Sequence, residues 1–185
     1  MNLSHSEKEL KKAKDSLEKM KEIKLKDDKN LLTEFESNWV DFLINLEKIW
    51  KKSELECQEI PQFQPWQGKY KRERKKDPLL RYLKNARDAD QHSIQPITEE
   101  KGYEAKIISP LEGAIYTEGD IIEIKAEFKE PRIETNKFNN RGVVYQPPEK
   151  HLDHYLTNPK DPIELAELGI KYYEEYLSQI REKFN

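Results

Sequence analysis

The feature that most constrains the fold is a wide apolar helical face between residues 31 and 55. Apolar side chains recur there at three- and four-residue steps, which is the spacing of one face of an α-helix. This is the strongest periodic signal in the chain, and a stripe this wide is buried in a globular protein. We therefore predict a core helix that Asn30 caps and that ends near Leu55. Its apolar face comprises Leu32, Phe35, Trp39, Phe42, Leu43, Leu46, Ile49 and Trp50.

Capping signals predict three more helices. An Asp-Pro pair at 77–78 predicts a helix that reaches His92, and a second pair at 161–162 predicts a final helix that runs to Phe184. Ser6, with Glu9 three residues later, is typical of a capping box and predicts an N-terminal helix. That helix has one narrow apolar stripe, which we expect to pack on a single neighbour, in the same chain or in a second subunit.

The second half of the chain begins with segments typical of strands. Tyr103–Ile108 and Ala114–Thr117 predict short strands around a turn at Pro110–Gly113. Asp120–Phe128 alternates between apolar and charged residues, and Gly142–Tyr145 predicts a last strand. We expect a small antiparallel sheet with one face in water.

Helix breakers and turn residues complete the predicted organisation. Prolines 61 and 65, with Gly68, predict a loop or a short irregular turn over Glu59–Gly68. Asn139-Asn140 with Gly142 predicts a turn before the last strand. The resulting class is α+β. A helical bundle occupies residues 1–98, and the sheet with the C-terminal helix occupies residues 99–185, packed with the bundle as one domain.

Composition favours a folded protein in the cytoplasm. Charged residues make up 37% of the 185, but three Trp, nine Tyr and six Phe oppose wholesale disorder. The lysine-rich first 14 residues lack the apolar stretch of a signal peptide, and no window approaches the roughly 18 apolar residues of a membrane span. Cys57 is the single cysteine, which excludes an intrachain disulfide, and we expect its side chain to be buried.

The charge is distributed unevenly, and residues 69–87 form a basic segment. Nine Lys or Arg face two acids there, a local net charge of +7 in a chain whose total is -3. Such a segment favours an anionic ligand, and nearby Trp66 and Tyr70 are able to stack on bases. The alternative is a solvated linker. The predicted nucleic-acid-binding residues are Lys69, Lys71, Arg72, Arg74, Lys75 and Lys76.

The basic segment ends in Arg87, Asp88 and His92, a combination suited to phosphate chemistry. Asp88 and His92 share a helix face, so the carboxylate is placed to orient the imidazole. Arg87 and His92 lie about 140° apart around a helix and do not share a face within one subunit. An arginine binds phosphate and a histidine transfers a proton, the two roles that metal-independent RNA cleavage needs. The alternative is an ordinary Arg87–Asp90 ion pair beside a surface histidine.

The stretch Leu79–His92 resembles the signature helix of HEPN domains, which are small helical bundles. Their mark is an arginine, usually followed by Asn, Asp or His, with a histidine after four to six intervening residues. Arg87, Asp88 and His92 match this pattern with four residues between Arg and His. The resemblance covers about Leu31–Ile94 and implies a metal-independent ribonuclease site composed across a homodimer. The chain departs from the all-helical family in the strands that follow the motif.

The sequence thus predicts an HEPN-like RNA-binding protein, a candidate metal-independent endoribonuclease that acts as a toxin or defence component. Arg87, Asp88 and His92 are its candidate catalytic residues. We expect no cofactor and no metal, with RNA, a second copy of the chain and an antitoxin as candidate partners. A second cluster, His151, Asp153 and His154, lacks further ligands at metal-binding spacing and is interpreted as a polar loop. The alternative function is a non-catalytic binding or dimeric assembly module.

Overall fold

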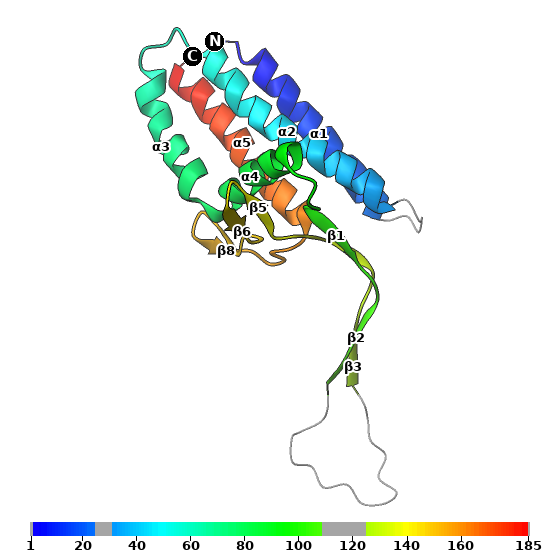
Figure 1. Cartoon of the computed structure of the whole chain (residues 1–185). Helices are drawn as coiled ribbons and strands as arrows, with labels where there is room; N and C mark the ends of the chain where they lie inside the picture. Colours follow the sequence, from blue (N-terminus) through cyan, green and yellow to red (C-terminus); the bar gives the residue numbers. More distant parts are fainter. Residues whose placement is uncertain (1, 25–30, 109–124, 185) are drawn as a thin grey trace, which may run out of the picture.

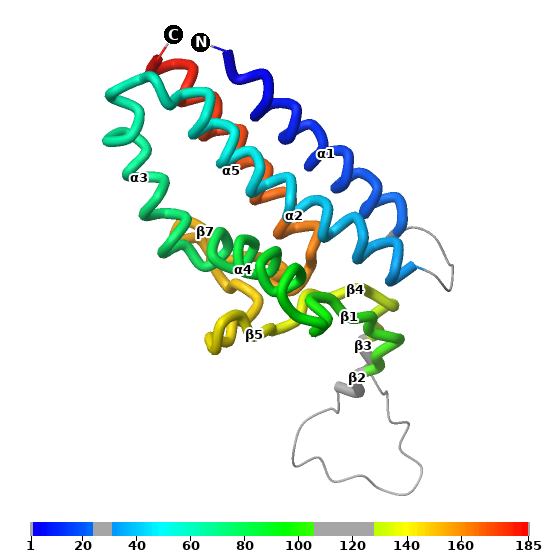
Figure 2. The backbone as a smooth tube through the Cα atoms, turned by 45° about the horizontal axis from the view of Figure 1, so that its top comes forward, coloured from blue at the N-terminus to red at the C-terminus, as the bar shows by residue number. Residues whose placement is uncertain are grey.

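The computed structural model describes residues 2–24, 31–108 and 125–184, and it confirms the predicted α+β class. The described helices are α1 (Ser4–Lys24), α2 (Leu31–Glu56), α3 (Phe63–Lys76), α4 (Pro78–His92) and α5 (Pro162–Phe184). Helices α1, α2 and α5 run side by side, and α4 lies at one end of this group beside the strands (Figures 1 and 2). None of the described helices combines the length and apolar character that a membrane crossing requires.

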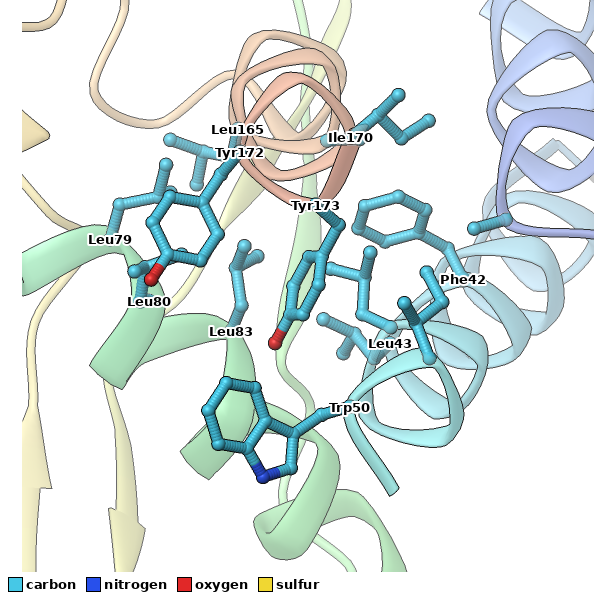
Figure 3. Packing of buried hydrophobic residues seen from close by; sticks show 14 of the residues in the cluster. Phe42, Leu43, Trp50, Leu79, Leu80, Leu83, Leu165, Ile170, Tyr172 and Tyr173 are labelled. Carbon is cyan, nitrogen blue, oxygen red and sulfur yellow. The ribbon is translucent and has the colours of Figure 1, made fainter. Parts of the chain in front are cut away.

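The predicted core helix is confirmed as α2. It begins at Leu31 and ends at Glu56, while Asn30, the predicted cap, lies outside the described residues. Trp39, Phe42 and Ile49 are fully buried, and the apolar face meets side chains of α4 and α5 (Figure 3). Burying a side chain of this size contributes about 1.5–3 kcal/mol, so this face is a major source of stability.

Helix α1 packs inside the chain, on α2 and α5. Its narrow stripe is buried there, which leaves the stripe unexposed to a second subunit. The predicted capping box is wrong, because the helix begins at Ser4 and Ser6 lies inside it. Instead, the carboxylate of Glu56, at the end of α2, accepts hydrogen bonds from the backbone N–H groups of His5 (2.7 Å) and Ser6 (3.1 Å). The side chain of Asn2 accepts from the N–H of Ser4 at 2.9 Å, so the start of α1 is capped both locally and by a carboxylate of another helix.

The predicted loop over Glu59–Gly68 is wrong from Phe63 onward, where α3 begins. Pro65 is the third residue of this helix, a position whose N–H has no intrahelical partner, so proline costs little there. Tertiary contacts override the weak local propensity, since Phe63, Gln67, Tyr70 and Arg74 are buried at helical spacing. Because this buried face includes polar residues, the apolar periodicity that predicts a helix is absent from the sequence here.

Helices α4 and α5 follow the predicted bounds. Asp77 caps α4 by accepting a hydrogen bond from the N–H of Leu80 (2.9 Å), and Pro78 is the first helical residue. Helix α5 returns to the bundle and packs on α1, α2 and α4, as expected. Gly169 permits its close approach, because a β-carbon there would lie 3.0 Å from Leu83 Cδ1 and 3.3 Å from Leu46 Cδ1.

The strands form four separate two-stranded antiparallel pairs in the described chain, in place of the single small sheet that we predicted. The β1–β4 and β2–β3 pairs lead away from the bundle as an arm, whereas β5–β6 lies against α4 (Figure 1). The pairs are β1 (Thr98–Lys101) with β4 (Arg132–Thr135), β2 (Glu104–Ile108) with β3 (Lys125–Lys129), β5 (Phe138–Asn140) with β6 (Val143–Tyr145), and β7 (Lys150–His151) with β8 (His154–Tyr155).

Some strand predictions are met and others are not. The strand predicted over Tyr103–Ile108 corresponds to β2, and β6 corresponds to Gly142–Tyr145. Asn139 and Asn140 belong to β5, so the turn is made by Arg141 and Gly142 instead. The alternation in Asp120–Phe128 does not bury its apolar end, because Phe128 is 78% exposed. The strand at Ala114–Thr117, the turn at Pro110–Gly113 and the start of Asp120–Phe128 lie outside the described residues.

Two glycines in helices allow a matched test of the α5 packing. We expect Gly68→Ala to raise the free energy of unfolding by about 0.5–1 kcal/mol, because its new methyl meets only Arg72 Nη1, at 3.7 Å. Gly169→Ala should lower it by about 1 kcal/mol or more, because overpacking against Leu83 and Leu46 outweighs the gain in helix propensity. Urea denaturation measures both, and equal stabilisation by the two substitutions would contradict the close approach of α5.

Candidate functional site

The motif residues lie on α4, a continuous helix from Pro78 to His92. Its buried side is formed by Leu79, Leu80, Tyr82, Leu83, Ala86 and Ala89, which pack on the bundle and on β5. Arg87 and Asp88 are therefore half-buried at the edge of this side, and His92 is exposed in the last turn. Because no break separates Arg87 from His92, the angle of about 140° between them persists.

Within the subunit, the structure pairs Arg87 with Asp88 and leaves His92 apart. Arg87 Nη2 lies 2.6 Å from Asp88 Oδ1, and Nη1 donates to Gln91 Oε1 at 3.1 Å. Neither the expected Asp88–His92 contact nor the alternative Arg87–Asp90 ion pair occurs among the described hydrogen bonds and ion pairs. Asp90 is partly buried, which raises the pKa of its carboxyl group.

The basic segment lies on two helices, α3 and α4, rather than in a linker, and one of its cations is structural. Arg74 is buried, forms an ion pair with Glu47 and lies over the Trp50 ring, 4.2 Å from its centroid. Trp66 and Tyr70, the residues predicted to stack on bases, also pack in the core. Tyr70 is buried against Tyr176, with ring centroids 5.0 Å apart, and burial raises the pKa of Tyr70 to about 12.

Trp66 has its ring surrounded by aromatic neighbours. Its centroid lies 4.9 Å from that of Tyr70, 5.4 Å from that of Phe184 and 5.8 Å from that of Phe63. The rings of Trp66 and Tyr70 thus pack against other aromatic rings of the protein, and these contacts hold α3 to α5.

A cleft of about 670 Å³ opens between α2, α3, α4 and β6. Six cations line it against one carboxylate, that of Glu47, which is already paired with Arg74. Lys75, Arg81 and Lys84 have no carboxylate partner among the described residues. The lining comprises Glu47, Trp50, Lys51, Lys71, Arg74, Lys75, Arg81, Lys84, Asn85 and Tyr145.

The cleft divides the six predicted nucleic-acid-binding residues into two groups. Lys71, Arg74 and Lys75 line it, whereas Lys69, Arg72 and Lys76 are absent from its lining. The structure adds Lys51, Arg81, Lys84 and Tyr145, which sequence analysis did not select. Arg81 and Lys84 are three residues apart on α4, a spacing that places them on one face; Lys51 and Tyr145 carry no such local signal.

The cluster at His151, Asp153 and His154 belongs to the β7–β8 hairpin, with Asp153 in its turn. His151 Nδ1 lies 3.0 Å from Asp77 Oδ1, and the N–H of Leu152 donates to Asp77 Oδ2 at 2.7 Å. Asp153 and His154 are exposed. No group of three or more His, Cys, Asp or Glu side chains with a metal-binding arrangement occurs in the part of the chain that the structure describes.

Comparisons with known proteins give no match to this chain among family models, curated proteins or solved structures. The resemblance to HEPN domains therefore depends on the residues of the motif helix alone.

Asp77 links the start of α4 to the β7–β8 turn, and this generates a test of stability against pH. Burial alone raises the pKa of Asp77, but hydrogen bonds from His151, Leu152 and Leu80 outweigh it and hold the pKa below its ordinary value. The ionised carboxylate therefore contributes stability that is complete above the unfolded-state pKa of about 4. This contribution is lost as the pH falls through the lower folded-state pKa.

We expect Asp77→Asn to lower the free energy of unfolding at pH 7 by about 1–3 kcal/mol, because an amide whose oxygen still caps α4 sets its NH2 group against the N–H of Leu152. The difference from the wild type should shrink at pH 3. Urea denaturation at both pH values measures it, with the exposed Asp153→Asn as the control. A deficit that is equal at pH 3 and pH 7 would contradict the ionised role of Asp77.

Proposed function

We propose that this protein binds RNA in the cytoplasm and cleaves it without a metal ion, as a toxin or defence component with an HEPN-like bundle. The observation that carries the proposal is the position of the basic cleft. Arg81 and Lys84 of the cleft and Arg87 and His92 of the motif are on the same helix, α4. A cleft with an excess of cations attracts a polyanion and aligns it along the helix that bears the motif.

The chemistry assigned to the motif is displacement at phosphorus. The RNA 2′-oxygen attacks the adjacent phosphorus as it loses its proton, and the bond to the 5′-oxygen breaks as that oxygen gains a proton. His92 is exposed and suited to one of these proton transfers. Arg87 stabilises the charge on the phosphoryl oxygens, as a phosphate displaces Asp88 from its guanidinium.

The helix geometry supports a composite site. Arg87 and His92 diverge within one subunit because α4 is continuous, so a shared phosphate requires Arg87 of one subunit and His92 of another. A two-fold homodimer supplies two such sites, each with one residue from each protomer. In this arrangement an antitoxin acts by covering the cleft or by separating the subunits.

The Arg87–Asp88 ion pair favours a second candidate, a non-catalytic binding or dimeric assembly module. If the Arg87 guanidinium stays paired with Asp88 and Gln91, the Asp88 carboxylate neutralises its charge. The guanidinium then stabilises α4 and does not bind a phosphate. This candidate retains RNA binding in the cleft and has no turnover, so cleavage assays distinguish the two.

We expect the cleft cations to dominate RNA affinity. Lys75→Ala combined with Lys84→Ala should weaken binding of single-stranded RNA about tenfold or more, and should reduce the slope of log affinity against log salt by about 1.4, for two lost phosphate contacts. Fluorescence anisotropy across a salt series measures both. Lys69→Ala combined with Lys76→Ala is the matched control, since it removes the same charge from α3 outside the cleft. Equal losses in the two double variants would count against the cleft.

Mixing two inactive variants tests the composite ribonuclease site. Arg87→Ala and His92→Ala should each abolish RNA cleavage when pure. After mixing and subunit exchange, half of the dimers are mixed and each has one intact site, so about one quarter of the wild-type activity should return. Gel analysis of labelled RNA in EDTA gives the rates. Mixed samples that stay inactive, while the wild type cleaves, rule out a site shared between subunits; a wild type that binds RNA without cleaving it supports the non-catalytic module.

A further inference from the structure

His92 faces a second hollow, formed where the end of α4 meets the turn between β5 and β6. This hollow has a volume of about 570 Å³. It brings together residues that lie about 50 positions apart in the sequence, since Arg141 of the turn lines it together with His92. The full lining is Ala89, His92, Ser93, Gln95, Asn139, Asn140 and Arg141.

The lining has the chemistry of an anion site. It contains no carboxylate, and Arg141 is its one permanent charge. Arg141 and His92 are both exposed, and neither has an ion-pair partner among the described residues. Ser93 donates to the Ala89 carbonyl from its N–H and its hydroxyl, each at 2.8 Å, so this one of the last carbonyls of α4 is hydrogen-bonded.

Hydrogen bonds fix the hairpin that positions Arg141. Gln95 accepts from the N–H of Asn139 at 2.8 Å and donates to the carbonyl of the same residue. Asn140, which is buried, donates from its side chain to Asn85 Oδ1 of α4 at 2.9 Å. The turn is closed by the N–H of Gly142, which donates to Asn139 Oδ1. The backbone of Arg141 is therefore held against the end of α4.

The conformation of Arg141 is costly for an arginine. Its φ of 53° lies in the left-handed region, where two-residue hairpin turns use Asn, Asp or Gly. Nothing in the turn requires a guanidinium, because the neighbouring Gly142, at φ 81°, and the Asn139 side chain supply the turn chemistry. Residues held in such conformations gather at functional sites, where the side chain has a use that local structure does not explain.

Arg141 lines the hollow with His92 and, unlike Arg87, has no ion-pair partner among the described residues. Arg87 is committed to Asp88 and Gln91 in the same subunit, and its side chain is only 22% exposed. Arg141 is therefore available to an anion beside His92 without the loss of an ion pair described here.

We propose that Arg141 and His92 of one subunit form a binding site for a phosphate group of the RNA backbone. The inference rests on the proposed RNA-binding function and adds a residue, Arg141, to its site. The cleft and this hollow both border α4 and the β5–β6 hairpin. Tyr145 of the hairpin lines the cleft beside Arg81 and Lys84, and Arg141 of the hairpin lines the hollow. An RNA strand bound in both therefore follows the line along which the hairpin meets α4.

The test reads the site directly and does not depend on turnover. Single-stranded oligouridylate with 2′-O-methyl groups, which cannot be cleaved, is titrated into the full-length protein. The NMR signals of the His92 imidazole, assigned with His92→Gln, report binding at the hollow, and fluorescence anisotropy reports total binding. We expect the His92 signals to shift, and Arg141→Asn to weaken the affinity read at His92 about tenfold.

The chosen variants preserve the fold. Asparagine adopts the left-handed conformation at position 141 more readily than arginine does, so Arg141→Asn removes the charge and keeps the turn. Arg141→Lys should retain most of the affinity. Lys137→Asn is the matched control, because it removes one positive charge from an exposed residue next to β5, and it should change the affinity less than twofold.

The outcomes separate this inference from the proposed function. Two results would overturn the phosphate site and leave RNA binding in place. In the first, anisotropy shows RNA binding but the His92 signals do not shift. In the second, Arg141→Asn binds the RNA as tightly as the wild type does. Absence of any RNA binding overturns both. Mixing provides a further check where cleavage occurs. Adding His92→Ala to Arg141→Asn should give no more cleavage than Arg141→Asn alone, because both residues belong to the same hollow of one subunit.

Discussion

The ion pair between Arg74 and Glu47 is the constraint on which the site depends. It lies where α2 and α3 meet, with the Trp50 ring against the guanidinium, and the two side chains are only 10% and 13% exposed. Removing one partner of a buried pair leaves an uncompensated charge, at a cost of about 3–5 kcal/mol. The pair therefore fixes the rotation of α3 about its axis. Lys71 and Lys75, on the same side as Arg74, consequently line the cleft.

The parts of the fold that were predictable from sequence are those with a strong local signal. The wide apolar face of α2 and the Asp-Pro starts of α4 and α5 each depend on neighbouring residues. Helix α3 was missed because its buried side includes Gln67, which bonds Tyr176, and Arg74, so the period is not apolar. The strand pairs depend on partners distant in sequence, such as Thr98 with Thr135, and local alternation does not reveal them.

The candidate site shows the same division. The motif and the basic segment are visible in the sequence because their residues are consecutive. Which cations are structural and which are free was not predictable, since Arg74 is distinguished from Lys75 by its contacts with Glu47 and Trp50 of another helix. Arg141 carried a weaker signal. It stands between Asn140 and Gly142 in a predicted turn, but its neighbour His92 is known only once β5 is placed on α4.

The hydrogen bonds of Asp77 have a consequence for the order of folding. One carboxylate accepts from Leu80, three residues away, and from Leu152, 75 residues away. The start of α4 is thus completed only when a loop of that length has closed, and this closure carries an entropic cost that grows slowly with length. Leu152 and Asp153, at φ 46° and 66°, form the β7–β8 turn, and local preference opposes the left-handed conformation at the leucine. Helix α4 and this turn therefore stabilise each other, because both donate to the same carboxylate.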